Sequence, residues 1–245
     1  MNAFPLVPFP SYLVPDFSYL VPDFMKGWFI TGTDTGVGKT LVSSALLMAL
    51  AGAGRRAVGM KPVASGCEPT SQGLRSADAE ALRAAGNVAA DYIDVCPYCF
   101  EEPTAPHLAA AAAGRQIDID TIRKAYTRLA ARADAVVVEG VGGWLVPINR
   151  HQTMADVVLA LDLPVILVVD LRLGSLNHAL LTRAAIEAGG CRLVAWVANA
   201  ALAEPPDGYL TALTDRLDAP LLGVIAHASR PQAAARRLDL ARLGV

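Results

Sequence analysis

The residues best suited to chemistry lie near the start of the chain, where residues 32–40 read GTDTGVGKT. Glycines in such a turn let backbone N–H groups converge on phosphate oxygens, and a helix that begins there adds partial positive charge. Lys39 can then reach the β- and γ-phosphates of a nucleotide, and the Thr40 hydroxyl can bind Mg²⁺. Five residues separate Gly32 from Gly38, where the common loop has four. The order of strand, loop, Gly-Lys-Thr and helix still favours a phosphate site over a chance turn.

An acidic residue ends a second apolar run, where residues 135–143 read AVVVEGVGG. A carboxylate at the end of a buried strand beside a phosphate loop is the usual second anchor for Mg²⁺. Asp170, after the apolar residues 165–169, is a rival, and either carboxylate can instead serve as a helix cap or loop residue. The glycines after Glu139 leave room for a ligand and favour Glu139.

A lysine follows a third apolar run, where residues 60–66 read MKPVASG. Lys61 at this strand end would point toward the same edge as the phosphate loop. The alternative is an ordinary solvated lysine, but the Pro, Ser and Gly residues that follow make this less convincing.

Short apolar runs alternate with longer amphipathic or alanine-rich runs along the chain. The apolar runs are continuous, as in parallel strands covered on both faces, and predict strands at residues 28–30, 57–60, 135–138, 165–169, 193–197 and 221–225. The longer runs predict helices at residues 40–53, 77–85, 119–132, 154–161, 177–188 and 209–217. This alternation predicts an α/β fold with a single doubly wound, mainly parallel sheet and helices on both faces, similar to P-loop NTPases. Lys39, Lys61 and Glu139 should meet at the carboxyl ends of its strands.

The bulk composition excludes several classes of protein. The 245 residues suit one α/β domain, and a net charge of −2 argues against a nucleic-acid partner. We find no uninterrupted apolar stretch of about 18 residues, the length of a membrane span. Prolines interrupt the N-terminal apolar residues, which argues against a secretory signal. We expect a cytoplasmic protein with small-molecule substrates and no membrane partner.

Residues 1–24 differ from the rest of the chain. The segment SYLVPDF occurs at residues 11–17 and again at 18–24, and Met25 follows directly. This duplication indicates a leader or cloning remnant that we expect to be disordered, with a docking peptide as the alternative. We therefore predict that the phosphate-loop domain comprises residues 25–245.

The four cysteines suit a reducing compartment. Cys96 and Cys99 spell C-x-x-C, a pattern of redox motifs and of half zinc sites. Cys67 and Cys191 are isolated in the sequence and supply no second ligand pair. Because Pro97 and the following residues indicate a loop, we interpret the C-x-x-C as a chance pair.

Several motifs, taken together, resemble those of the dethiobiotin synthetases. They are GTDTGVGKT at 32–40, KPVASG at 61–66, PYCFEEPTAPH at 97–107, VEGVGG at 138–143, LGSLNHA at 173–179 and WVAN at 196–199. The first motif alone would indicate only a phosphate-binding loop, whereas the ordered set is much more specific. The resemblance extends from about Met25 to about Ile225.

The resemblance implies a Mg²⁺- and ATP-dependent ligase. Members of this family close the cyclic urea of dethiobiotin from 7,8-diaminopelargonate and CO₂, and convert ATP to ADP and phosphate. A substrate amine takes up CO₂ as a carbamate, a carbamate oxygen attacks the γ-phosphate, and the second amine closes the ring of the mixed anhydride. The resemblance also implies a homodimer with its site at the interface.

The resemblance further assigns residues to roles. Lys39 and Lys61 would be catalytic, and Thr40, Asp78 and Glu139 would bind Mg²⁺. ATP contacts would come from Gly36, Val37, Gly38, Lys39, Thr40, Leu41, Asp78, Glu139, Gly140, Val141, Gly142, Asn199, Ala200, Ile225, Ala226 and His227. Substrate contacts would come from Thr35, Ser65, Gly174, Ser175, Leu176 and Asn177. Without the resemblance, Asp78 would be interpreted as a residue that complements a helix dipole.

The sequence departs from the family pattern at several of these positions. Gly36 stands where relatives often carry Glu, and Ala200 replaces a familiar Asp. Ala226, His227 and Arg230 replace a Pro, an aromatic residue and a Glu. These changes cluster on nucleoside recognition rather than on the phosphate chemistry.

Two other classes of phosphate-loop protein are alternatives. A partition or septum-positioning switch ATPase has a similar loop but carries an extra lysine early in it, where this chain has Asp34. An amidation domain of the cobyrinate type would be expected to bring a glutaminase domain, for which the last residues leave no space.

Overall fold

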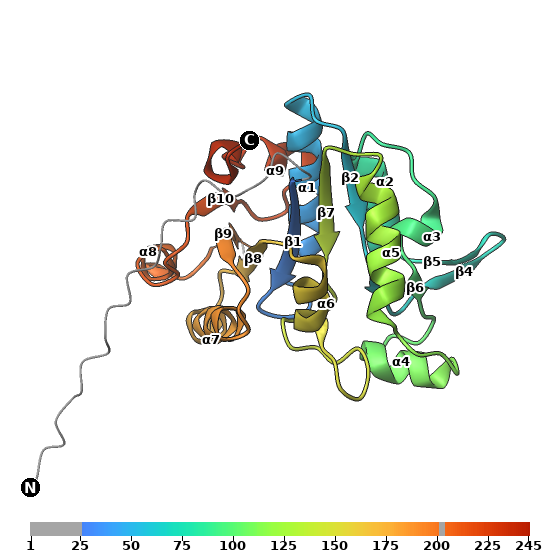
Figure 1. Cartoon of the computed structure of the whole chain (residues 1–245). Coiled ribbons are helices and arrows are strands. Elements are labelled where there is room, and N and C mark those ends of the chain that lie inside the picture. Colours follow the sequence, from blue (N-terminus) through green and yellow to red (C-terminus); the bar gives the residue numbers. More distant parts are fainter. Residues whose placement is uncertain (1–25, 201–203) are drawn as a thin grey trace, which may run out of the picture.

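The central sheet has six parallel strands in the computed structural model, which describes residues 26–200 and 204–245. The strands are β1 (Lys26–Gly32), β2 (Ala57–Met60), β7 (Ala135–Glu139), β8 (Val165–Asp170), β9 (Leu193–Asn199) and β10 (Leu221–Ile225). Their order across the sheet is β10-β9-β8-β1-β7-β2 (Figure 1). β1 thus lies between β7 and β8, so the ends of all three strands meet at one edge. The predicted leader at residues 1–24 lies outside the described residues.

Helices cover both faces of this sheet (Figure 1). One face carries α1 (Lys39–Gly52), α2 (Ala77–Ala85) and α9 (Pro231–Ala235), and the other carries α5 (Ile119–Ala130), α6 (Met154–Leu161), α7 (Ser175–Ala188) and α8 (Tyr209–Thr214). Trp28 and Ile30 of β1 pack in the cluster that contains α1, whereas Phe29 packs in the cluster that contains α5 and α6. This alternation explains why the strand sequences are continuously apolar. The predicted doubly wound fold is confirmed.

Several short elements lie outside the predicted set. They are β3 (Val63–Ala64), β4 (Glu68–Thr70), β5 (Gly73–Arg75), α3 (Tyr92–Val95), β6 (Tyr98–Cys99), α4 (Pro106–Ala112), α9 and the 3₁₀-helix η1 (Leu240–Leu243). Elements of two to seven residues are too short to show a clear hydrophobic period. Two of them matter for the site, because β3 and β6 pair in parallel beside it.

Cys67 is isolated in the sequence but not in the folded chain. Cys67 forms a disulfide with Cys99, while Cys96, the other half of the C-x-x-C, is buried and free. The pairing depends on β3 and β6 lying side by side, which the sequence pattern did not predict. No helix in residues 26–200 or 204–245 has the length and apolar character needed to cross a membrane.

Candidate functional site

The phosphate loop connects the end of β1 to the start of α1. Gly38 precedes the helix with φ of 96°, a left-handed conformation that favours glycine. A Cβ atom at Gly38 would also collide with the Asn199 side chain, whose Nδ2 donates a hydrogen bond to Val37 O at 2.9 Å. The loop is therefore held against β9, with the free N–H groups of the α1 terminus available for an anion.

Lys39 is buried in this loop and donates a hydrogen bond from Nζ to Asp34 O at 2.8 Å. Burial and the nearby charge of Lys61 lower the pKa of Lys39 to about 8. An ammonium whose charge is disfavoured in this way gains strongly from a polyphosphate partner.

Lys61 follows the end of β2 and is only 3% exposed. Its Nζ lies 2.6 Å from Glu139 Oε1 and 2.8 Å from Asp78 Oδ2, and it donates to Gly140 O at 3.1 Å. Burial opposes the charged form, but Glu139 and Asp78 outweigh it and raise the pKa of Lys61. The solvated-lysine alternative is excluded by this burial.

Asp78 lies in the first turn of α2, which Ser76 caps through its side chain. Asp78 does more than complement the helix dipole, because its Oδ1 lies 2.8 Å from Thr40 Oγ1 while its Oδ2 contacts Lys61. Burial favours the protonated acid, yet Lys61 and Thr40 lower the pKa of Asp78. Thr40 Oγ1 also lies 2.9 Å from Glu139 Oε1, so three oxygen-bearing side chains converge at one point.

Glu139 is fully buried at the end of β7, and its Oε2 has no hydrogen-bond partner among the residues that the structure describes. An unpaired buried carboxylate oxygen is costly, and a cation is the natural group to satisfy it. Asp170, the rival acid, also has a buried oxygen, Oδ1, without a hydrogen-bond partner among the described residues, but its Oδ2 forms an ion pair with Arg172 Nε at 3.1 Å, and Arg172 also reaches Asp34. The convergence with Thr40 is therefore made by Glu139 and not by Asp170.

One pocket of about 700 Å³ collects many of the predicted residues. Those that line it are Thr35, Gly36, Gly38, Lys39, Thr40, Lys61, Ser65, Asp78, Glu139, Val141 and Gly142. The segment Pro103–Pro106 and Val146 also line the pocket, although sequence analysis assigned them no role. The motif at residues 97–107 was the available signal for this wall.

Other predicted residues are not among those that line this pocket. Ala200 N–H donates to Ile225 O at 2.8 Å, so the predicted nucleoside contacts at the ends of β9 and β10 are neighbours beside the phosphate loop. Residues 174–177 lie at the start of α7 and line none of this pocket. Leu41 and Gly140 are also outside its lining, although Gly140 O accepts from Lys61.

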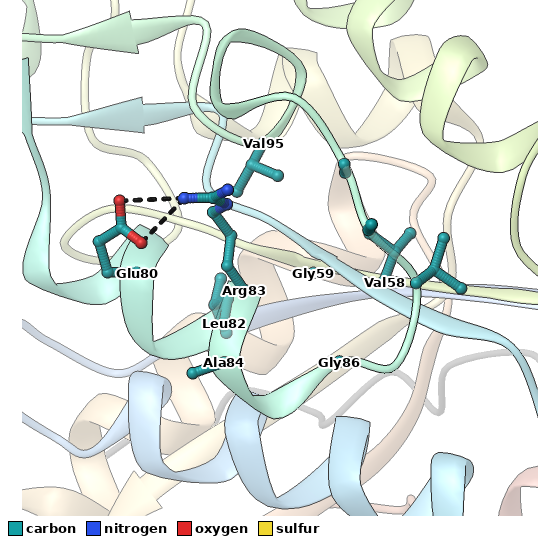
Figure 2. Close-up of a pocket in the computed structure, with 11 residues that line it drawn as sticks. Val58, Gly59, Glu80, Leu82, Arg83, Ala84, Gly86 and Val95 are labelled. Carbon is teal, nitrogen blue, oxygen red and sulfur yellow. Dashed lines mark hydrogen bonds and ion pairs between the residues drawn. The ribbon is translucent and has the colours of Figure 1, made fainter. Parts of the chain in front are cut away.

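A second hollow of about 320 Å³ lies between β2, α2 and the chain that follows α2 (Figure 2). Val58, Leu82 and Val95 form its walls. The charged side chains among its lining residues, Glu80 and Arg83, bind each other at 3.0 Å. This hollow therefore offers less chemistry than the phosphate-loop pocket.

Comparisons with known proteins identify the family of the chain. Residues 26–233 match the AAA domain family. Among curated relatives, the ATP-dependent dethiobiotin synthetase BioD of Nitrosospira multiformis is 47% identical over 224 residues, which are 90% of this chain and 97% of that protein. The BioD 1 protein of Escherichia coli O157:H7 is 48% identical over 202 residues, 81% of this chain and 89% of the relative.

Solved structures show the same fold at much lower identity. The MinC:MinD cell division complex of Aquifex aeolicus matches with a TM-score of 0.54 and 18% identity, covering 88% of this chain and 87% of that chain. At this identity, the match shows only that the two chains share a fold. By its sequence similarity to these relatives, the chain belongs to the ATP-dependent dethiobiotin synthetases.

Proposed function

We propose that the pocket at the phosphate loop binds Mg·ATP, CO₂ and 7,8-diaminopelargonate and closes the urea ring of dethiobiotin. The observation that carries this proposal is the convergence of Thr40, Lys61, Asp78 and Glu139 at one point beside Lys39. A phosphoryl transfer needs positioning and charge neutralisation more than covalent help, and this cluster supplies both.

The phosphate loop would hold the triphosphate of ATP. Lys39 would exchange its bond to Asp34 O for the β- and γ-phosphates, while N–H groups at the start of α1 bind the remaining oxygens. Asn199 would contact the nucleoside of ATP, because its side chain binds Val37 O in the loop.

Thr40, Asp78 and Glu139 would hold Mg²⁺. Their oxygens are the hard ligands that this ion prefers, and within residues 26–200 and 204–245 the buried Glu139 Oε2 has no hydrogen-bond partner. Mg²⁺ commonly binds one or two carboxylates together with substrate phosphates and waters, and Asp78 and Glu139 supply two carboxylates beside Thr40. When bound, the ion would neutralise charge on the β- and γ-phosphates.

Lys61 would act on the carbamate. Its raised pKa keeps the ammonium charged, so it can bind the carbamate oxygens and stabilise charge as one of them attacks the γ-phosphorus. The second amine of the substrate would then attack the carbamoyl carbon and expel phosphate. Ser65 and the Pro103–Pro106 wall would orient the diamine, since both line the same pocket.

We further propose that the protein works as a homodimer in the cytoplasm. Leu173 is 82% exposed and Leu181 is 61% exposed beside the start of α7, and a second subunit would cover such side chains. Gly174–Asn177 would then bind the carboxylate tail of the substrate that the partner subunit holds, because an anion suits a helix N-terminus.

A coupled assay of ADP release tests the proposed reaction. Mg·ATP, bicarbonate and 7,8-diaminopelargonate are supplied together and then omitted one at a time. We expect ADP release only when all are present, with dethiobiotin as the product by mass spectrometry. Release of ADP that ignores the diamine would instead favour a switch ATPase.

A further inference from the structure

The Cys67–Cys99 disulfide joins two walls of the pocket. Cys67 belongs to the segment that carries Lys61 and Ser65, and Cys99 belongs to the segment that leads into Pro103–Pro106. The Cα atoms are 6.2 Å apart, within the usual range for a disulfide. A change at this bond can therefore reach the pocket through the backbone on either side.

Backbone hydrogen bonds also join these two segments. Lys61 N–H donates to Val95 O at 2.7 Å, Cys67 N–H donates to Phe100 O at 2.9 Å, and β3 pairs with β6 between them. The segments should therefore stay paired without the disulfide but lose a covalent restraint at their outer end. These backbone hydrogen bonds do not include the phosphate loop.

A groove of about 430 Å³ leads to only one of the two sulfurs. Cys99 lines this groove and is partly exposed, whereas Cys67 is buried and does not line it. A thiol in the groove can therefore attack Cys99 Sγ and leave Cys67 as the departing sulfur. Cys67 Sγ lies 3.7 Å from Ala64 O, so once the released sulfur has taken a proton from water it can donate a hydrogen bond to that carbonyl.

Two arginines give this groove a positive character. The Arg75 guanidinium lies 4.1 Å above the Tyr92 ring, and that of Arg115 lies 5.3 Å from the Tyr98 ring centroid. Arg75 has a partner in Glu80 at 3.5 Å. Arg115 has no carboxylate within ion-pair distance among the residues that the structure describes. A carboxylate-bearing ligand therefore suits this groove better than a neutral one.

We propose that Cys67–Cys99 is a thiol-exchange site for an anionic low-molecular-weight thiol bound in the Arg75–Arg115 groove, and that the closed disulfide orders the substrate wall of the pocket. The assignment of this wall, which contains Ser65 and Pro103–Pro106, to the diamine rests on the proposed function. In a reducing compartment such a pair is typically transient and redox-sensing.

The exchange balances with two thiols. The first thiolate forms a bond to Cys99 Sγ, the S–S bond breaks, and its electron pair leaves on Cys67 Sγ, which takes a proton from water. A second thiolate attacks the sulfur of the first, releases Cys99 as a thiolate, and leaves the small molecule as its own disulfide. Oxidation by that small disulfide runs through the same steps in reverse.

Reduction should affect the diamine more than ATP. The joined segments carry Ser65 and Pro103–Pro106, and loss of pre-ordering in a wall weakens binding of the ligand that contacts it. We expect reduction to raise the KM for the diamine roughly 3- to 10-fold, with the KM for ATP changed by less than about twofold.

The kinetic test compares two redox forms of the full chain. One sample is oxidised with glutathione disulfide, the other is reduced with a phosphine, and intact mass confirms each form. Cys99→Ser should show the reduced kinetics in both samples, and Cys67→Ser should stop at a mixed disulfide on Cys99 and never reach the closed form, whereas Cys96→Ser, the matched control at the free cysteine that lines the same groove, should still switch. Equal diamine KM values in the two wild-type forms would overturn the proposal. Absence of diamine-dependent ADP release in both forms would instead defeat the proposed function.

A second test concerns the groove, and it needs no enzyme activity. The rate at which the disulfide opens is measured with glutathione, which is anionic, and with 2-mercaptoethanol, which is neutral. Arg115→Ala should slow opening by glutathione on the order of 3- to 10-fold and leave opening by the neutral thiol unchanged. Equal rates in the variant and wild type, or an equal loss with both thiols, would remove the groove from the proposal.

Discussion

Lys61 Nζ lies 2.6 Å from Glu139 Oε1, and both side chains are almost completely buried. The same ammonium binds Asp78 at 2.8 Å. These are the two carboxylates proposed to hold Mg²⁺, so a metal ion and the Lys61 ammonium would share the same two carboxylates. Binding of the metal would loosen Lys61 and leave it available for the carbamate.

Replacement of Lys61 should make folding stability depend on Mg²⁺. In Lys61→Met, Glu139 and Asp78 lose their buried cation, and we expect the free energy of unfolding to fall by about 3–5 kcal/mol in EDTA. Millimolar Mg²⁺ should restore a measurable part of this loss in the variant but stabilise wild type little. Urea unfolding with and without Mg²⁺ measures both effects.

Lys124→Met is the matched control, because Lys124 is exposed on α5. It should change neither the unfolding free energy nor its response to Mg²⁺. A Lys61→Met protein that is as stable as wild type in EDTA would contradict the assigned ion pairs.

Glu139 and Asp170 can be separated by paired amide substitutions. Glu139→Gln removes a charge beside Thr40 and should lower turnover on the order of 100-fold, the scale for loss of one transition-state charge stabiliser. Asp170→Asn removes a carboxylate that binds Arg172 instead, and should leave the Mg²⁺ concentration for half-maximal activity within about twofold. Titration of ADP release with Mg²⁺ distinguishes them, and a larger effect from Asp170→Asn would reverse the assignment.

Much of the fold was predictable, because parallel strands covered on both faces have continuously apolar sequences. β2, β10, α2 and α6 have the predicted bounds. α7 begins at Ser175, two residues before the predicted start, because Gly174 adopts a left-handed φ of 91° and allows an earlier helix start.

The site was predictable only where strand ends set it. Lys61 and Glu139 meet because β2 and β7 are neighbours and end at the same edge. The direction in which the Asp78 side chain points depends on how α2 packs, and the pairing of Cys67 with Cys99 depends on how the short strands β3 and β6 pack. No pattern in the local sequence predicts this packing.

Nucleotide affinity should fall above pH 8. Burial and Lys61 lower the pKa of Lys39 to about 8, so the free protein loses this positive charge as pH rises through that value. Bound phosphates favour the charged form, so the affinity is fully present below the pKa and falls by up to about tenfold per pH unit above it. Calorimetry with ADP in EDTA measures this without metal. The affinity of Lys39→Arg for ADP should stay constant from pH 7 to 9.5. A wild-type affinity that does not change with pH would contradict the prediction.

Two glycines of the phosphate loop should differ in their tolerance of alanine. Gly38 has φ of 96°, and its added Cβ would collide with Asn199, whereas Gly36 has φ of 76° and open space around it. Both substitutions carry a left-handed backbone cost of about 1–2 kcal/mol, but only Gly38→Ala must also displace a side chain that holds the loop against β9. We therefore expect the Kd for Mg·ADP to rise at least about tenfold more in Gly38→Ala than in Gly36→Ala, since each 1.4 kcal/mol is a factor of ten. Calorimetric titration of both variants measures the difference, and equal losses would show that backbone conformation alone, without the Asn199 contact, limits residue 38.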